Sequence, residues 1–218
     1  MIDIRENSKN DVFKSFLLEE AEYDGIEEFP VLKSCNEIPN NVITFTEALK
    51  TKKYDSWVCF YELDYQFFRI WNNPRKYINI LKKFNGVITP DFSVYVNMPL
   101  IMQKYHIFMG RALGHWFYLN GIKIIPNVRL GDSRTYRFAL DGINKGDVIA
   151  FGTLGCYKKT VEREILLNGI RMAISKLEPS AVLFYGSRPD EIINSFPNVD
   201  FYVYEGNNSQ KLKERKNG

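Results

Sequence analysis

The sequence predicts an α/β protein in which parallel strands alternate with helices. Seven short runs of β-branched and aromatic residues recur along the chain, and a longer amphipathic run follows each of the first six. The short runs are continuously apolar, which suits strands that are covered on both faces. Their alternation with helices favours βα units on a parallel sheet. We therefore expect an incomplete or TIM-like barrel, with an open doubly wound sheet as the alternative.

The expected elements follow one another from Val42 to Tyr204. The expected strands are Val42–Phe45, Trp57–Tyr61, Val87–Thr89, Lys123–Val128, Val148–Gly152, Ala181–Tyr185 and Phe201–Tyr204. The expected helices are Thr46–Lys53, Tyr65–Phe84, Pro99–Asn120, Ser133–Leu140, Thr160–Leu177 and Pro189–Ser195.

Helix boundaries are marked by capping residues and prolines. Asn73 followed by Pro74 combines a cap with a proline at the first helical position, so the run Tyr65–Phe84 should be two helices. Pro99 can open the long apolar helix in the same way, and Gly121 can close it in the left-handed conformation. Asp132 is placed to cap the helix that follows it.

Composition divides the chain into three parts. Residues 1–28 hold nine acidic residues against three basic ones, and Asn10–Glu20 has apolar residues at helical spacing with Asn10 or Asp11 as its cap. We interpret 1–28 as an acidic helical arm, 29–206 as the α/β domain, and 207–218 as a basic, flexible tail.

Several classes of protein are disfavoured. With 45% hydrophobic and 25% charged residues the chain is typical of globular proteins. Three cysteines without CxxC spacing argue against a disulfide framework and a metal–sulfur cluster. No secretory signal is visible, and the longest apolar stretch, 99–119, is interrupted by Lys104, His106, Arg111 and His115. We expect a cytoplasmic protein with no membrane partner.

Carboxylates follow two of the expected strands. Glu62 and Asp64 come after the strand ending at Tyr61, and Asp91 follows Thr89-Pro90. In parallel α/β proteins functional groups gather at the carboxyl ends of strands. These three residues are candidates for catalysis, either as a general acid and base or as ligands of a divalent metal ion, which is the cofactor that we consider. They could equally cap helices or accept backbone hydrogen bonds in turns.

Glycine-containing turns after the late strands resemble phosphate cradles. Glycine lets backbone N–H groups approach an anion, and a helix start and a cation complete the charge. Arg129 could bind a carboxylate or phosphate at its own strand end, or form a structural pair with Asp132 or Asp91. The candidate anion-binding residues are Arg129, Asp132, Gly155, Lys158, Gly186, Ser187 and Arg188. The turns match no established phosphate-loop pattern, and ordinary strand–helix turns also need glycine.

Basic residues form two moderate clusters. Arg75, Lys76, Lys82 and Lys83 share a helix with Tyr77 and Phe84, and Lys158, Lys159 and Arg163 make a second group. Such clusters suit nucleic acid, but a solvated helix face explains them equally well, and the net charge is only +3.

Several segments resemble one known family. The segments FYELDYQFFRIWNNP, GVITPDFSVYVNMPL, GIKIIPNVRLGD and AVLFYGS are similar to an uncharacterised domain of unknown function that is common in bacteriophages and mobile elements of Gram-positive bacteria. The resemblance runs from about Pro30 to Ser187. It implies a phage setting and an α/β domain, and it carries no established activity or catalytic residue.

Three functions are compatible with the sequence. The first is an enzyme that acts on a small anionic, phosphate-bearing or nucleotide-like ligand at the strand ends. The second is a non-catalytic effector that binds a host or phage protein, and the third is a nucleic-acid-binding accessory protein. Fold alone does not choose among them.

Overall fold

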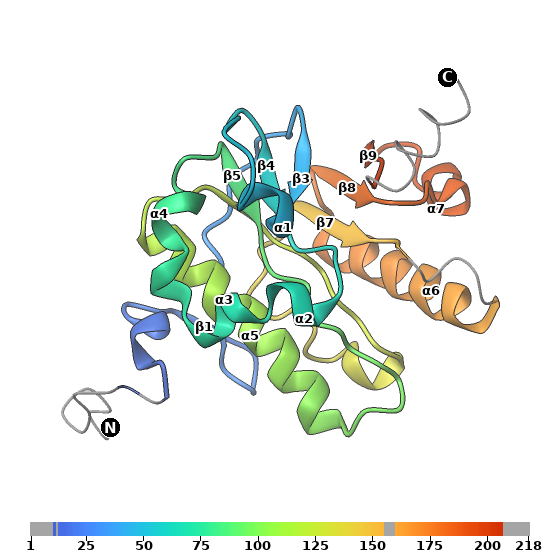
Figure 1. Ribbon diagram of the computed structural model, residues 1–218. Coiled ribbons are helices and arrows are strands. Elements are labelled where there is room, and N and C mark those ends of the chain that lie inside the picture. Colours follow the sequence, from blue (N-terminus) through green and yellow to red (C-terminus); the bar gives the residue numbers. More distant parts are fainter. Residues whose placement is uncertain (1–10, 12, 155–159, 207–218) are drawn as a thin grey trace.

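The chain forms two parallel sheets, described here from a computed structural model that covers residues 11, 13–154 and 160–206 (Figure 1). The first sheet has the order β3-β4-β5-β6 and the second the order β7-β8-β9. A small antiparallel hairpin precedes them. The strands are β1 (Tyr23–Asp24), β2 (Phe29–Pro30), β3 (Val42–Thr44), β4 (Trp57–Cys59), β5 (Gly86–Ile88), β6 (Ile124–Ile125), β7 (Val148–Gly152), β8 (Ala181–Tyr185) and β9 (Asp200–Tyr204).

Helices connect successive strands, as the alternating sequence pattern predicts. They are α1 (Phe45–Ala48), α2 (Asp64–Phe67), α3 (Arg69–Asn72), α4 (Ile78–Leu81), α5 (Leu100–Leu119), α6 (Thr160–Leu177) and α7 (Asp190–Ser195), with 3-10 turns at Ser15–Leu18, Pro74–Lys76 and Ser133–Thr135. The predicted break at Asn73-Pro74 is confirmed, because the Asn73 side chain accepts a hydrogen bond from the backbone N–H of Lys76 and Pro74 begins the next turn. None of these helices combines the length and apolar character that crossing a bilayer requires.

The two sheets meet between β6 and β7. Asn127 forms a parallel bridge with Ala150, and the backbone N–H of Val128 donates to the carbonyl of Ala150 at 2.8 Å. Strand order therefore follows chain order from β3 to β9, without the reversal that defines a doubly wound sheet. The α/β prediction is confirmed. Among the described residues no ladder joins β9 to β3, so the strands form two joined sheets and not a closed ring.

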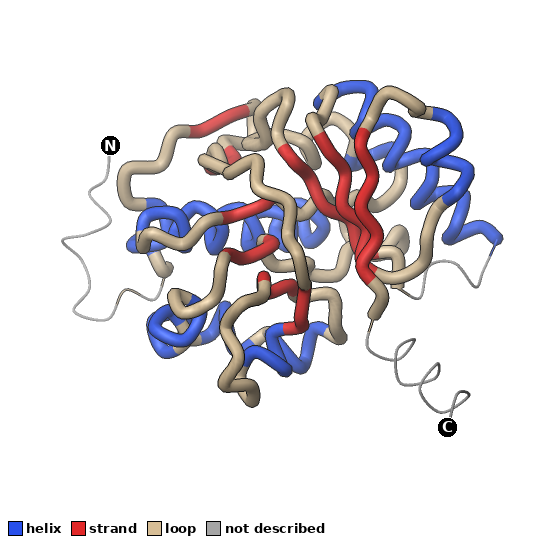
Figure 2. Tube along the Cα trace, turned by 90° about the horizontal axis from the view of Figure 1, so that it is seen from above, coloured by secondary structure: helices blue, strands red, loops and turns tan. Residues whose placement is uncertain are grey.

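Of the four apolar clusters among the described residues, three form layers against the sheets. Along β4 the side chains alternate: Trp57 and Cys59 face the second sheet, and Val58 faces the helices. Between the sheets, side chains of β4 to β6 pack against those of β7 and β8. A second cluster lies beneath helices α1 to α5, and a third lies between β7–β9 and helices α6 and α7. Figure 2 shows the two sheets side by side, with α6 and α7 beyond the long strands.

The expected helix over Asn10–Glu20 is wrong. The structure has a single 3-10 turn, Ser15–Leu18, bounded by Lys14 and Glu20, each with a left-handed φ of 56°. Asp11 caps this turn and not a longer helix: its carboxylate accepts from the Ser15 hydroxyl and from the backbone N–H of Phe16. The turn is pinned by packing, because Leu17 is buried and Phe16 lies edge-on to Trp116 of α5.

The expected helix Ser133–Leu140 is also too long. Only Ser133–Thr135 is helical, and turns continue to Gly142. Asp132 is the cap that the sequence predicts, since its side chain accepts from the backbone N–H of Arg134 at 3.0 Å. Further along, the Arg111 guanidinium of α5 binds the carbonyls of Ala139 and Asp141, so this backbone is satisfied by a side chain from another element.

Candidate functional site

The carboxyl ends of neighbouring strands bring Tyr61, Asp91, Asn127 and Arg129 together. Tyr61 follows β4, Asp91 follows β5, and Asn127 and Arg129 follow β6. Because all these strands run in the same direction, their exits lie at one edge of the joined sheets. We call these four residues the strand-end cluster.

Asp91 is the carboxylate of this cluster. Its side chain is 11% exposed, and one oxygen accepts from the Asn127 amide at 2.8 Å. The other oxygen lies 3.5 Å from an Arg129 guanidinium nitrogen. Arg129 is 22% exposed, so the pair reaches the surface on the arginine side.

Asn127 holds Asp91 in place. It is 2% exposed, and all four of its polar groups have partners. Its backbone N–H donates to the Thr89 hydroxyl at 2.8 Å, and its backbone carbonyl accepts from Arg111 at 3.1 Å. Its side-chain oxygen accepts from the Tyr61 hydroxyl at 3.0 Å, which leaves the amide nitrogen directed at Asp91. This fixes one orientation of the amide and therefore one position of the carboxylate.

The environment favours the protonated form of Asp91. Burial raises the pKa of this carboxyl above its ordinary value of 3.8, and the nearby charge of Asp64 adds to that effect. Arg129 and the Asn127 hydrogen bond act in the opposite direction without cancelling it. Burial and the charge of Asp91 also raise the pKa of the Tyr61 phenol well above 10, so this hydroxyl stays a donor. A carboxyl of this kind can take up and release a proton.

The backbone at Gly152 lies directly against the cluster. A Cβ at this position would lie 2.5 Å from a ring carbon of Tyr61 and 3.4 Å from an Asp91 oxygen. The Tyr61 ring cannot retreat easily, because it stacks on Tyr185 of β8 with ring centres 5.4 Å apart. Glycine is therefore needed here because the backbone and the Tyr61 ring approach each other closely.

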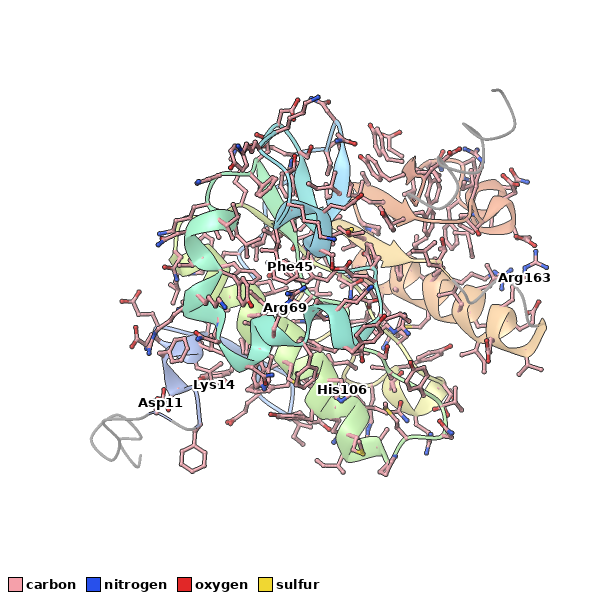
Figure 3. All side chains as sticks on the ribbon, in the orientation of Figure 1. Asp11, Lys14, Phe45, Arg69, His106 and Arg163 are labelled. Atoms are coloured by element: carbon pink, nitrogen blue, oxygen red, sulfur yellow. The ribbon has the colours of Figure 1, made fainter. Side chains whose placement is uncertain are left out.

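Glu62 and Asp64 lie outside the cluster and contact backbone. Glu62 accepts from the backbone N–H of Thr46 at 2.9 Å and so caps α1. Asp64 accepts from the backbone N–H and hydroxyl of Ser93, which ties the loop after β4 to the loop after β5. The carbonyl of Ser93 lies 2.5 Å from Nδ1 of His106. Figure 3 shows His106 on α5. In the described parts of the chain, no three His, Cys, Asp or Glu side chains gather into a metal site.

The other predicted anion-binding residues are spread along the edge. Gly186 has φ of 120° and packs on Thr153, whose hydroxyl donates to the carbonyl of Ser187 at 2.8 Å. Arg188 is exposed and bonded to Asp190 at 2.8 Å. Asp132 is bound to Arg134 at 2.9 Å. Gly155 and Lys158 lie outside the described residues.

Sequence reasoning missed Tyr61, Asn127 and Arg111 as parts of this arrangement. In the sequence, Tyr61 marks only the end of an expected strand, and Arg111 only interrupts an apolar stretch. Asn127 lies within the expected strand Lys123–Val128, where a polar amide between apolar residues must find buried partners. That requirement is the signal that could have identified it.

Comparison with known proteins defines the family. A family model described as "Domain of unknown function (DUF4417)" matches residues 21–203. The chain belongs to this family. It is also similar to two phage proteins, each called "Gene 1 protein": it is 31% identical over 123 residues to that of Mycobacterium phage L5 and 25% identical over 123 residues to that of Mycobacterium phage D29.

The phage matches cover part of each protein. They span 56% of this chain, 54% of the L5 protein and 46% of the D29 protein, so this DUF4417 chain spans about half the length of the curated relatives it matches. No solved structure matches the chain. The resemblance to a phage-associated domain of unknown function is confirmed.

Proposed function

We propose that this DUF4417 protein is an enzyme that acts on a phosphate-bearing, nucleotide-like substrate at the strand-end cluster. The observation that supports this is the state of Asp91: a nearly buried carboxyl with a raised pKa, held in one orientation by Asn127, beside a guanidinium that reaches solvent. In this proposal Asp91 is the general acid–base group, because a carboxyl whose pKa moves toward neutrality transfers protons more effectively near neutral pH.

Arg129 is the proposed anion-binding group. Its distance of 3.5 Å from Asp91 leaves the pair loosely joined, and its side chain is the more exposed of the two. A guanidinium can bind two phosphate oxygens at once. When a phosphate takes that position, Asp91 loses part of the attraction that favours its ionised form, so substrate binding would raise its pKa further.

Exposed aromatic side chains on two neighbouring segments suit a nucleobase. Tyr65, 77% exposed, lies in α2, the helix that follows β4, and Tyr95, 55% exposed, lies on the loop after β5. The bonds between Asp64 and Ser93 hold the start of α2 to this loop. Exposed tyrosine faces can stack on a base while the phosphate lies on Arg129. The phage origin of the relatives supports action in the cytoplasm of a bacterial host.

The test is a ligand screen by thermal shift. Nucleoside mono-, di- and triphosphates are added to the wild-type chain with and without Mg²⁺, a cation that phosphates and one carboxylate can hold together. A ligand should raise the melting temperature of wild type and of Lys145→Gln, a matched control for loss of one exposed cation, but not of Arg129→Gln. The Asp91→Asn variant should still bind the ligand and lose turnover, measured by ³¹P NMR of the ligand. The proposal fails if no ligand stabilises wild type or if Arg129→Gln responds equally.

A further inference from the structure

Two lysine-bearing loops lie side by side at the opposite edge of the first sheet. One leads from α1 into β4 and the other from α4 into β5, so both enter the amino ends of their strands (Figure 1). Trp57 pairs with Gly86, and the backbone N–H of Asn85 donates to the carbonyl of Ser56 at 3.1 Å. Further out, the Tyr54 and Phe84 rings meet edge-on at 5.2 Å. The loops therefore stay in contact over their last three residues.

These loops concentrate positive charge. They carry Lys50, Lys52, Lys53, Lys82 and Lys83, which we call the lysine edge, and all five are exposed. The ammonium of Lys83 lies 5.2 Å from the centre of the Tyr54 ring, so this side chain reaches across to the loop that carries Tyr54. The one carboxylate within the two loops is that of Asp55.

Three other exposed lysines of this protein have carboxylate partners, whereas exposed Lys76 and Lys176 form no ion pair within the described residues. Lys33 pairs with Glu22 at 2.9 Å and Lys145 with Glu178 at 2.7 Å, and Lys123 pairs with Glu37. Within the described ranges, none of the five lysines of the lysine edge forms such an ion pair. Like charges held on adjacent loops repel one another, and a bound polyanion would relieve that repulsion.

We infer that the lysine edge binds the phosphate backbone of nucleic acid. Flexible ammonium groups suit phosphate oxygens as point charges, and several of them together release counterions from the nucleic acid. Protein interfaces, by contrast, are depleted of lysine and built around apolar or aromatic centres. Tyr54 is half-buried and Phe84 is buried, so the lysine edge offers no exposed ring for stacking. Binding is therefore to the backbone and independent of base sequence.

This surface is separate from the strand-end cluster. The cluster follows the carboxyl ends of β4 to β6, whereas the lysine edge precedes the amino ends of β4 and β5. Substitutions at one edge should leave the other unchanged, so this inference can fail while the proposed function stands, and the reverse.

The test is a titration of a fluorescein-labelled DNA duplex of arbitrary sequence, followed by anisotropy over a range of salt concentrations. The test variant replaces Lys52, Lys53, Lys82 and Lys83 with glutamine. It should bind at least about tenfold more weakly at ~0.1 M salt, and the slope of log K against log salt should be shallower by up to about 3. A second duplex of different sequence should give the same affinity for wild type.

Two control variants separate the lysine edge from net charge and from folding. Glutamine at Lys33, Lys123, Lys145 and Lys176 removes the same charge elsewhere and should leave binding within about twofold, as expected for loss of long-range attraction alone. Arginine at the four test positions keeps the charge and should keep binding. The inference is overturned if wild type does not bind the duplex, or if the variant with glutamine at Lys33, Lys123, Lys145 and Lys176 loses as much affinity as the test variant. It is also overturned if poly-L-glutamate competes as well as DNA at equal charge.

Discussion

Arg111 is a buried cation that donates a hydrogen bond to the backbone of Asn127 in the strand-end cluster. Its replacement by methionine should strongly destabilise the fold. The side chain is 3% exposed, and its guanidinium donates to the carbonyls of Asp141 at 3.1 Å, Asn127 at 3.1 Å and Ala139 at 2.9 Å. Burial lowers its pKa to about 10, so it is still charged at neutral pH. Methionine has a similar length and can fill the space, but it donates no hydrogen bond.

The expected loss in the free energy of unfolding is the difference between the lost hydrogen bonds and the relief of burying a charge. Hydrogen bonds to a charged group contribute roughly 1.5–3 kcal/mol each, and three carbonyls lose their donor together. Removing the buried charge recovers part of this, since burying an isolated ion costs several kcal/mol. The net loss in the free energy of unfolding should be about 3–5 kcal/mol, comparable to the breaking of other buried charged networks. Arg111→Lys should lose less, because an ammonium keeps the charge and reaches fewer of the three carbonyls.

The assay is urea unfolding followed by tryptophan fluorescence, with the free energy extrapolated to water. Arg188→Met is the control, because Arg188 is exposed and bonded only to Asp190 among the contacts described, and its loss should change stability by less than about 0.5 kcal/mol. A loss below about 1 kcal/mol for Arg111→Met would show that water satisfies the three carbonyls and that Arg111 does not organise the segment around Asn127.

Three further predictions concern the strand-end cluster. Because the fold raises the pKa of Asp91, the native state binds more protons than the unfolded chain above pH 3.8 and loses stability as the pH rises through the folded pKa. Asp91→Asn should therefore be more stable than wild type at pH 7, with the gap closing below pH 3.8 in urea titrations; a gap independent of pH would contradict this. Gly152→Ala should cost roughly 1–3 kcal/mol in the same assay, since its methyl group would overlap the Tyr61 ring, and an unchanged midpoint would mean that the ring moves freely. Tyr61→Phe leaves the Asn127 side-chain oxygen without its donor and should cost about 1–3 kcal/mol; double-mutant coupling with Asn127→Ala tests this, and zero coupling would refute it.

The sequence predicted the order of elements because the order depends on local patterns. Each expected strand contains a run of β-branched or aromatic residues, and the central strands are buried on both faces, as Val182 and Leu183 of β8 show: one packs under the helices and the other between the sheets. The long helix α5 lies within the predicted range Pro99–Asn120, and Gly121 closes it with φ of 77°.

The lengths of the helices were less predictable, because side chains from distant elements determine where a helix ends. Nothing near Ser133–Leu140 shows that Arg111, far back in the sequence, will bind the carbonyl of Ala139 in this segment and that of Asp141 just after it. The candidate site likewise combines residues that the sequence could identify with residues that only the structure could assign. Asp91 and Arg129 could be selected because they follow strands, but Glu62 follows a strand too, and only the packing of α1 shows that it is a helix cap.

Asn127 contributes both to the stability of the fold and to the arrangement of the candidate site. It forms the bridge to Ala150 that connects the two sheets, and the same residue orients Asp91 through its amide. A change that displaces the Asn127 segment at this bridge therefore also alters the hydrogen bond that orients the Asp91 carboxyl. A variant that loses activity and also melts earlier would not separate these two roles. A variant that keeps the melting temperature and changes the pH profile of turnover would separate them. The reason is that the proton affinity of Asp91 depends on its distance from Arg129 and from the Asn127 amide.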